Sequence, residues 1–175
     1  MGEGKGAVRQ MIHPGDTVPA VPVKLVDAEG VHDVSSADVL GAGRVVMFTV
    51  PGAFTPTCHL SHLPGYIAAA AKLKAAGADR IVCATVNDRH VVKAWAEQTD
   101  SLDRIDFIAD GNAALARAMG LDRDMSPSQM GTRFVRAAAV FENGIARHVF
   151  VEDKAGQVTG SGAAAILMAL SAPVM

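Results

Sequence analysis

Cys58 is the residue of this chain whose neighbours most clearly allow chemistry. It lies in the stretch "PGAFTPTCHLSHLPGY", from Pro51 to Tyr66, among prolines, threonines and histidines. Four interpretations are open for such a cysteine: a small buried hydrophobe, one half of a disulfide, a metal ligand or a nucleophile. Each of them makes a different demand on the elements that surround the sulfur.

The elements around Cys58 are predicted to be a buried strand and a helix. "RVVMFTV", from Arg44 to Val50, is a continuous apolar and β-branched run, which is typical of a strand buried on both faces. A helix is predicted over residues 56–76, with Thr55 as its N-cap. Cys58 then lies in the first turn, where unpaired backbone N–H groups and the helix dipole favour a thiolate.

Two positions of this helix are expected to be irregular. Pro64 and Gly65 lie inside it, and because a proline removes a backbone donor and clashes with the preceding turn, a kink or break is predicted there. Gly77 follows the helix and is expected to end it in the left-handed conformation.

A metal site is the next alternative, because "CHLSH" offers Cys58, His59 and His62. On a helix Cys58 and His62 share a face, whereas His59 projects about 100° away. Only two ligands converge, and no distant Cys/His pair at zinc spacing completes a set of four. No metal is therefore predicted. Both histidines are interpreted as peripheral, His62 as a polar residue near the pocket and His59 as a surface residue.

Length and composition narrow the classes of function. The chain has 175 residues, 50% hydrophobic and 19% charged, which predicts one globular domain over residues 1–175. A net charge of -2 and a pI near 6.3 argue against nucleic acid as a partner. No apolar run reaches the ~20 residues that span a bilayer, and the N-terminus lacks the apolar core of a secretion signal, so a cytoplasmic protein with no membrane partner is expected. Two cysteines in a chain of this size do not suggest a secreted disulfide scaffold.

The remaining patterns predict an α/β protein of the thioredoxin-like kind, with a central mixed sheet flanked by helices. The strand at Arg44–Val50 and a second buried strand at Arg80–Val86 are joined by a helix, so a right-handed crossover makes them parallel and adjacent or nearly so. The other expected elements are a hairpin over 21–34, a capped helix in "NDRHVVKAWAEQ", a strand in "IDFIAD", a short helix in "NAALARAMG", a loop in "SPSQMGT", a hairpin with an Asn143-Gly144 turn and a final helix in "GAAAILMAL".

The string Pro51 to Cys58, "PGAFTPTC", resembles the P-x-x-x-T-x-x-C motif of peroxiredoxins. With "HLPGY" it is similar in particular to the type II (atypical, redoxin) subfamily. The likeness extends through "VNDRHVVKAWAE", "FIADGNAALARAMGL" and "GTRFVR", and so covers nearly the whole chain. The resemblance implies a thiol peroxidase without a cofactor, acting on hydrogen peroxide and small alkyl hydroperoxides.

The resemblance also implies roles for the residues around the sulfur. The Thr55 hydroxyl, the backbone N–H groups of Thr57 and Cys58 and a distant arginine would stabilise the transition state, while Pro51 would shield the sulfur from water. The physics requires such a site. At an ordinary thiol pKa near 8.5, full ionisation gains at most a few tens of fold in thiolate at pH 7. A lower pKa also makes the sulfur less nucleophilic, so the remaining acceleration must come from pre-organised donors.

"TRFVRAAAVF" offers two arginines for this role, Arg133 and Arg136. They are close to a predicted strand, where residues three apart face opposite sides, so both cannot reach the sulfur equally. The family pattern places the sulfur-facing guanidinium immediately before the strand. That position is Arg136, which leaves Arg133 as a supporting or surface residue.

Oxidised Cys58 would be a sulfenic acid that a second thiol must reduce. The stretch "KAGQVTGSGAAAI", which corresponds to the resolving-cysteine region of some type II members, contains no cysteine. Cys83 matches in spacing a cysteine proposed as resolving in plant type II enzymes. It lies inside a predicted strand about 10 Å below the strand end, too far for a disulfide without local unfolding. Cys83 is thus interpreted as a core residue, and glutathione with glutaredoxin, or thioredoxin, as the reductant.

Three further expectations concern partners and rival functions. The resemblance implies a homodimer, with Phe54 and the loop "SPSQMGT" on its surface. The alternative function is a peroxide sensor that uses the same Cys58 to pass oxidation to a partner protein. A general disulfide reductase is disfavoured because Thr55 occupies the position of the first cysteine of a C-x-x-C motif.

Overall fold

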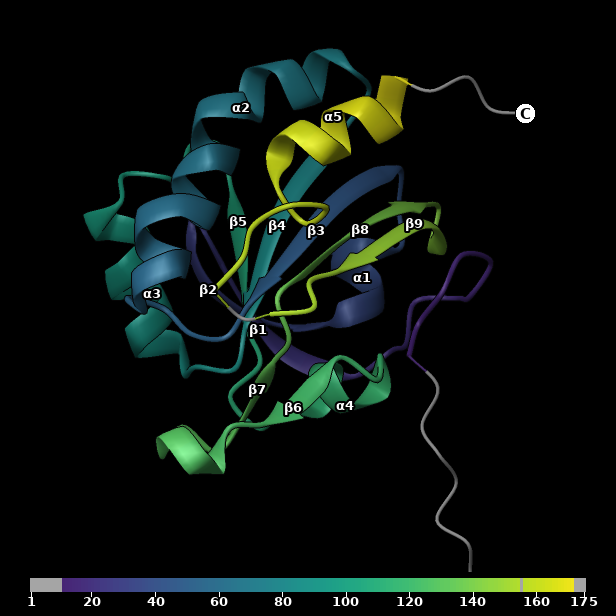
Figure 1. Ribbon diagram of the computed structural model, residues 1–175. Coiled ribbons are helices and arrows are strands. Elements are labelled where there is room, and N and C mark those ends of the chain that lie inside the picture. The colour runs from purple at the N-terminus through teal and green to yellow at the C-terminus, as the bar shows by residue number, and fades with distance from the viewer. Residues whose placement is uncertain (1–10, 155, 172–175) are drawn as a thin grey trace, which may run out of the picture.

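The computed structural model describes residues 11–154 and 156–171, and a seven-stranded mixed sheet forms its centre (Figure 1). The strand order is β2-β1-β5-β4-β3-β8-β9, and three neighbouring strands, β3, β4 and β5, run parallel. The other strands are antiparallel to their neighbours. The strands span β1 Pro22–Asp27, β2 Gly30–Ser35, β3 Arg44–Val50, β4 Arg80–Thr85, β5 Asp106–Ala109, β8 Ala137–Glu142 and β9 Ile145–Val151. The predicted mixed α/β sheet with β3 beside a parallel β4 is confirmed.

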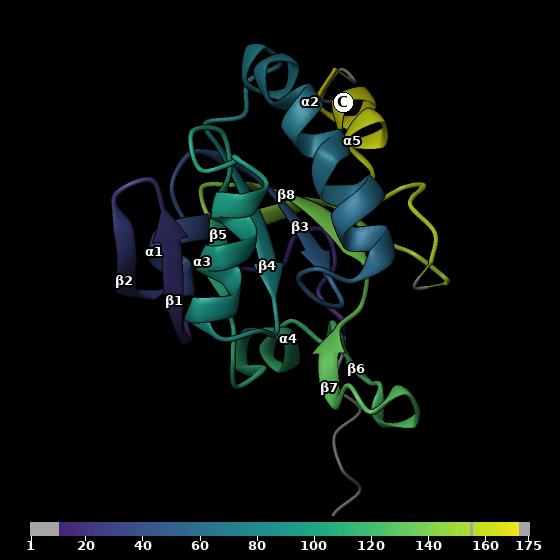
Figure 2. The same cartoon turned by 90° about the vertical axis from the view of Figure 1, so that its left-hand side faces the viewer.

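Helices cover both faces of this sheet (Figures 1 and 2). Residues of α2, α3 and α5 pack with one face, where Phe48, Cys58 and Cys83 lie in the same buried cluster. Residues of α1 and α4 pack with the other face, around Met47 and Phe141. The alternation of strand side chains between two buried clusters explains why β3 is apolar along its whole length. The helices span α1 Ser36–Leu40, α2 Leu63–Ala75, α3 Arg89–Gln98, α4 Ala114–Ala118 and α5 Ala163–Ser171.

Local signals located several turns and caps correctly. Asn143 and Gly144 have φ values of 47° and 81°, as expected for the tight turn between β8 and β9. Gly77 has φ 111° just beyond α2, which confirms it as the left-handed end of that helix. Asp88 accepts hydrogen bonds from the backbone of His90 and Val91 and so caps α3.

Two small features were missed. Helix α1 follows β2 directly, and its capping box of Ser35 and Asp38 is a sequence signal that could have predicted it. The stretch "SPSQMGT" is not simply a loop. It holds a 3₁₀ turn, Ser126–Ser128, between the strands β6 Asp122–Asp124 and β7 Thr132–Phe134, which pair as a separate small sheet.

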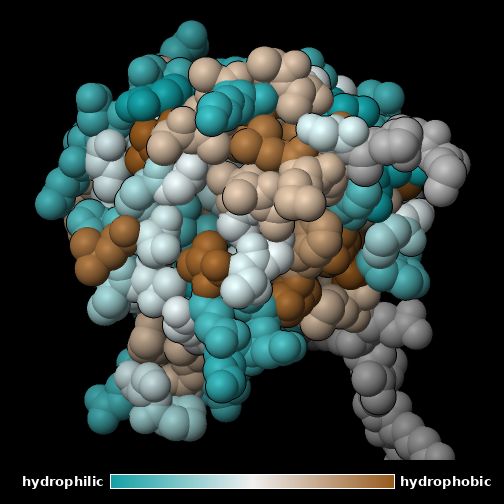
Figure 3. All heavy atoms as spheres, turned by 45° about the horizontal axis from the view of Figure 1, so that its top comes forward, coloured by the Kyte–Doolittle hydropathy of each residue, from teal (hydrophilic) through white to brown (hydrophobic). Residues whose placement is uncertain are grey.

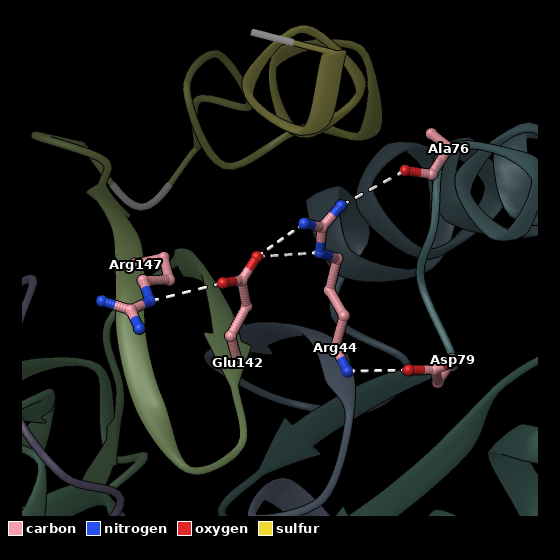
Figure 4. A network of polar contacts seen from close by, with 5 residues as sticks. All are labelled: Arg44, Ala76, Asp79, Glu142 and Arg147. Atoms are coloured by element: carbon pink, nitrogen blue, oxygen red, sulfur yellow. Dashed lines mark hydrogen bonds and ion pairs between the residues drawn. The ribbon is translucent and has the colours of Figure 1, made fainter. Parts of the chain in front are cut away.

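A polar network ties the amino end of β3 to its neighbours (Figure 4). The Arg44 guanidinium donates to the Glu142 carboxylate at 3.0 Å and 2.6 Å, and Arg147 lies 3.4 Å from the other oxygen of that carboxylate. Arg44 also donates through its backbone to Asp79 at 2.8 Å and through its side chain to the Ala76 carbonyl at 3.5 Å. This network holds the start of β3, the end of α2 and the β8–β9 hairpin together.

Two expectations from the sequence depend on residues that lie outside the described part of the chain. The single domain over residues 1–175 stays a prediction, since residues 1–10 and 172–175 lie outside them. The N-terminal residues on which the expectation about a secretion signal depends also lie outside. Within the described part of the chain, no helix combines the length and apolar character needed to cross a bilayer.

Candidate active site

Cys58 lies at the start of a helix that follows β3, as the sequence predicted, but the helix is built differently. Pro56 and Thr57 are helical, and the backbone N–H of His59 donates to the Thr55 carbonyl at 2.8 Å. Cys58–His62 then form a π turn, in which the Leu63 N–H donates to the Cys58 carbonyl. The kink expected at Pro64 and Gly65 is absent, and the irregularity is this wider turn before them. Helix α2 begins at Leu63, so Pro64 lies in its first turn, where a backbone N–H has no partner within the helix.

Thr55 precedes the helix, but its side chain does not act as the expected N-cap. The hydroxyl donates to the Gly52 carbonyl at 2.7 Å, across the turn that connects β3 to the helix. That bond uses the hydroxyl proton and leaves the lone pairs of the Thr55 oxygen for another donor. Thr57 and Cys58 are in the first helical turn, where backbone N–H groups have no partner within the helix.

The turn from Pro51 to Phe54 is held by side chains from distant elements. The Asn87 side-chain oxygen accepts from the Ala53 N–H at 2.9 Å and from the Thr85 hydroxyl at 2.7 Å. Arg133 donates to the carbonyl of the buried Pro51 at 3.3 Å and to that of Val86 at 3.2 Å. Arg133 therefore supports the turn rather than the sulfur.

Arg136 is the arginine that contacts Cys58. Its Nη2 donates to the Cys58 Sγ at 3.1 Å, and its Nη1 donates to the His62 Nδ1 at 2.8 Å. Arg136 is 2% exposed and both Cys58 and His62 are 1% exposed or less. Because the site excludes water, the charge of the guanidinium acts on the sulfur with little screening.

His62 belongs to the site, which corrects its interpretation as a peripheral residue. Its Nε2 lies 2.9 Å from the Ser161 carbonyl, an acceptor only, so Nε2 carries the proton and Nδ1 is free to accept from Arg136. Burial, opposed by the Ser161 hydrogen bond and assisted by the charge of Arg136, lowers the pKa of His62 from 6.5 to about 4. The i,i+4 spacing from Cys58 is the sequence signal that could have assigned His62 to this site.

His59 is also less peripheral than predicted. Its Nδ1 accepts from the indole N–H of Trp95 on α3 at 3.0 Å, and its ring lies 5.8 Å from that of Phe54. Phe54 has φ 63°, an uncommon backbone for a non-glycine residue, and its side chain is 42% exposed. His59 thus links the first turn of the helix to α3.

Cys83 lies in β4, paired in register with Phe48 of β3, and is fully buried. Both cysteines are free thiols. Burial and the nearby charge of Cys58 raise the pKa of Cys83 well above its ordinary value, with Arg136 opposing. Cys83 is therefore a protonated core thiol under the active site in this conformation, which agrees with its interpretation as a core residue.

Two further observations concern the described residues away from Cys58. Among residues 11–154 and 156–171, no three His, Cys, Asp or Glu side chains gather as a metal site. A cavity of about 450 Å³ lies between β1, the start of α3 and the loop after β5, with Lys24, Arg89 and Asp110 in its wall. Its wall contains neither Cys58 nor the residues that contact the sulfur.

Comparisons with known proteins agree with this geometry. Residues 13–167 match the family model Redoxin. The chain is 42% identical over 157 residues to Peroxiredoxin-2C of Oryza sativa subsp. japonica, covering 89% of this chain and 96% of that protein. Peroxiredoxin-2D of Arabidopsis thaliana is 38% identical over the same shares of the two chains. The crystal structure of reduced Prx3 from Vibrio vulnificus in complex with hydrogen peroxide superposes with a TM-score of 0.85 and 38% identity, over 92% of this chain and 100% of that one.

The mixed sheet, the buried thiol at a helix start and these relatives together place the chain among the thiol peroxidases with a thioredoxin-like fold. The chain belongs to the Redoxin family, and within it to the type II peroxiredoxins.

Proposed function

We propose that Cys58 is the peroxidatic residue, which reduces hydrogen peroxide and small alkyl hydroperoxides. The Cys58 thiolate attacks one peroxide oxygen, the O–O bond breaks, and the other oxygen leaves as water or an alcohol after taking up a proton. Cys58 is thereby oxidised to a sulfenic acid. The observation that carries this assignment is the 3.1 Å contact from the Arg136 guanidinium to a sulfur that is 0% exposed.

The neighbouring groups have distinct parts in this proposal. Arg136 and the backbone N–H groups of Thr57 and Cys58 stabilise the charge that develops as the O–O bond breaks. The Thr55 hydroxyl, anchored on Gly52, orients the peroxide through its lone pairs. Pro51 is buried beside them and keeps bulk water away. The enclosed position of the sulfur supports small peroxides as substrates.

The sulfenic acid is reduced by an external thiol in this proposal, with glutathione and glutaredoxin, or thioredoxin, as the reductant. Cys83 is 0% exposed within β4, and a disulfide with Cys58 requires Cα atoms closer than ~7 Å in the right orientation. That burial favours a partner from outside over Cys83. A resolving role for Cys83 is the alternative, and it would need the helix around Cys58 to unfold.

A homodimer and a cytoplasmic location complete the proposal. Phe54, 42% exposed, and Leu60, 75% exposed, are large apolar side chains near the active site, and the 3₁₀ turn Ser126–Ser128 carries no buried residue. These surfaces would be covered by a second copy of the chain. Light scattering coupled to gel filtration tests the dimer.

Two free thiols are consistent with a reducing compartment such as the cytoplasm.

Peroxide consumption with excess reductant tests the function directly. The unmodified chain should consume many hydrogen peroxide molecules per molecule of protein with either glutathione and glutaredoxin or thioredoxin, and Cys58→Ser should consume none. Consumption of a single equivalent, followed by transfer of oxidation to another protein, would favour the peroxide sensor instead.

A further inference from the structure

Glu152 is a buried carboxylate that is linked to His62 through Ser161. It follows β9 directly and is 4% exposed. Its carboxylate accepts from the Thr159 hydroxyl at 2.6 Å, from the Ser161 N–H at 3.0 Å and from the Ser161 hydroxyl at 2.8 Å, and also from the Thr159 N–H. Four donors on one carboxylate fix the backbone of the segment 159–161.

The segment fixed by Glu152 presents the Ser161 carbonyl to the active site. This carbonyl accepts from the His62 Nε2 at 2.9 Å and from the Tyr66 hydroxyl at 2.7 Å. The first contact sets the tautomer of His62, because a carbonyl requires a donor. His62 must then accept at Nδ1, and the group it accepts from is Arg136.

Glu152 also contacts Arg136 through its backbone. Its N–H donates to the Arg136 carbonyl at 2.9 Å, at the open end of the β8–β9 hairpin. One residue thus holds the main chain of Arg136 and, through Ser161 and His62, the Nη1 end of the same guanidinium. Because the guanidinium is a rigid plane, holding its Nη1 on His62 restricts the direction of Nη2, and Nη2 is the donor to Cys58.

We propose that Glu152 is a positioning residue for peroxide reduction, which orients Arg136 on the Cys58 sulfur through Ser161 and His62. The inference rests on the proposed roles of Cys58 and Arg136. Burial raises the pKa of Glu152, but its hydrogen bonds with Thr159 and Ser161 prevail and lower it to about 2, so the carboxylate is charged across the working pH range. A glutamine amide at this position would point its N–H groups at the Thr159 and Ser161 donors, which need an acceptor.

The test is the second-order rate constant for oxidation of Cys58 by hydrogen peroxide, measured by quenching and alkylating the remaining thiol. Glu152→Gln should lower it roughly tenfold, the scale on which groups that orient an active residue act. Glu142→Gln is the matched control. That carboxylate lies by the turn end of the same hairpin, bound to Arg44 and Arg147 (Figure 4), and its loss should leave the rate constant unchanged.

A double-mutant cycle separates positioning from a merely structural role. If Glu152 acts through Arg136, Glu152→Gln should cost much less than tenfold in an Arg136→Lys background. An equal cost in both backgrounds would overturn the proposal, and so would an unchanged rate constant in the single variant. Should Glu152→Gln fail to fold, Thr159→Val combined with Ser161→Ala, which removes two of the four donors, takes its place in the cycle.

The same measurements distinguish this proposal from the proposed function. A wild-type chain that reacts quickly with peroxide, with Cys58→Ser inert, supports the function whatever Glu152→Gln does. A wild-type chain that does not react would overturn the function and the positioning role together.

Discussion

Arg136 connects the reactive sulfur of Cys58 to the surrounding structure. Its two terminal nitrogens address two acceptors, the Cys58 sulfur and the His62 ring, in a fully enclosed place. The fork of a guanidinium suits this geometry, whereas a lysine ammonium is a single point of charge. The orientation of the cation, not only its presence, is therefore part of the site.

Replacing Arg136 by lysine should slow oxidation of Cys58 by hydrogen peroxide roughly a hundredfold, because one donor to the developing charge is lost or misplaced. Stopped-flow kinetics with a single addition of peroxide measures this. Arg133→Lys is the control, because Arg133 donates to the Pro51 and Val86 carbonyls and not to the sulfur. A larger effect at Arg133 than at Arg136 would invert the two assignments.

Cys83→Ser should leave steady-state peroxidase activity with an external thiol largely intact. The reason is that Cys83 is buried in β4 as a protonated thiol, its pKa raised by burial and by the charge of Cys58. Turnover of hydrogen peroxide with glutathione and glutaredoxin, or with thioredoxin, measures it. Near-total loss of turnover in a folded variant would show that Cys83 resolves the sulfenic acid.

At the scale of elements, the site depends on how a turn and a helix start are held in place. The turn after β3 is held by Asn87, in the loop between β4 and α3, and by Arg133, in β7. Cys58 and His62 are the first and last residues of the π turn, and both contact the Arg136 guanidinium. Each anchor is a polar side chain on a carbonyl or an N–H group.

Asn87→Ala should weaken both the turn and the catalysis. It removes the acceptor of the Ala53 N–H and of the Thr85 hydroxyl, so we expect a loss of about 1–2 kcal/mol in the free energy of unfolding. The rate of peroxide reduction should fall with it, because Pro51 and Thr55 belong to the same turn. Urea denaturation and stopped-flow kinetics on one preparation measure the two effects; full stability and full rate would show that the turn holds itself.

The main elements could be predicted from the sequence because local patterns decide them. The apolar run of β3, the Asn143-Gly144 turn and the Asp88 cap each carry their signal within a few residues. The choice of Arg136 came from a family resemblance, since the residues alone left two arginines open. The i,i+4 spacing of His62 from Cys58 was a usable signal, whereas Asn87 and Glu152 carried none, because Asn87 contacts Ala53 of the turn and Glu152 reaches His62 through Ser161 only in the folded chain.

At the scale of the whole molecule, the buried neutral His62 makes stability depend on pH. Its pKa is lowered from 6.5 to about 4, mainly by burial, while Arg136 and Glu152 face it with opposite charges. The unfolded chain therefore binds a proton at this residue, between those two values, that the folded chain does not. The contribution of His62 to the free energy of unfolding is therefore fully present well above pH 6.5 and is lost as the pH falls toward 4.

We predict that this histidine costs the protein roughly 2 kcal/mol of unfolding free energy between pH 7 and pH 5. Urea denaturation at the two pH values measures the loss, and His62→Gln should lose correspondingly less, since glutamine does not titrate. The comparison cancels the shared contributions of the other titrating groups. Equal losses in the two proteins would contradict a neutral, buried His62.

The central claim is that Cys58 is the thiol that peroxide oxidises. Peptide mass spectrometry after one equivalent of hydrogen peroxide, with dimedone present to trap sulfenic acid, tests it most directly. We predict the dimedone adduct on the peptide that carries Cys58, its absence from the peptide of Cys83, and its replacement by a glutathione adduct when glutathione is added instead. An adduct on Cys83, or none on Cys58 while peroxide is consumed, would contradict the account.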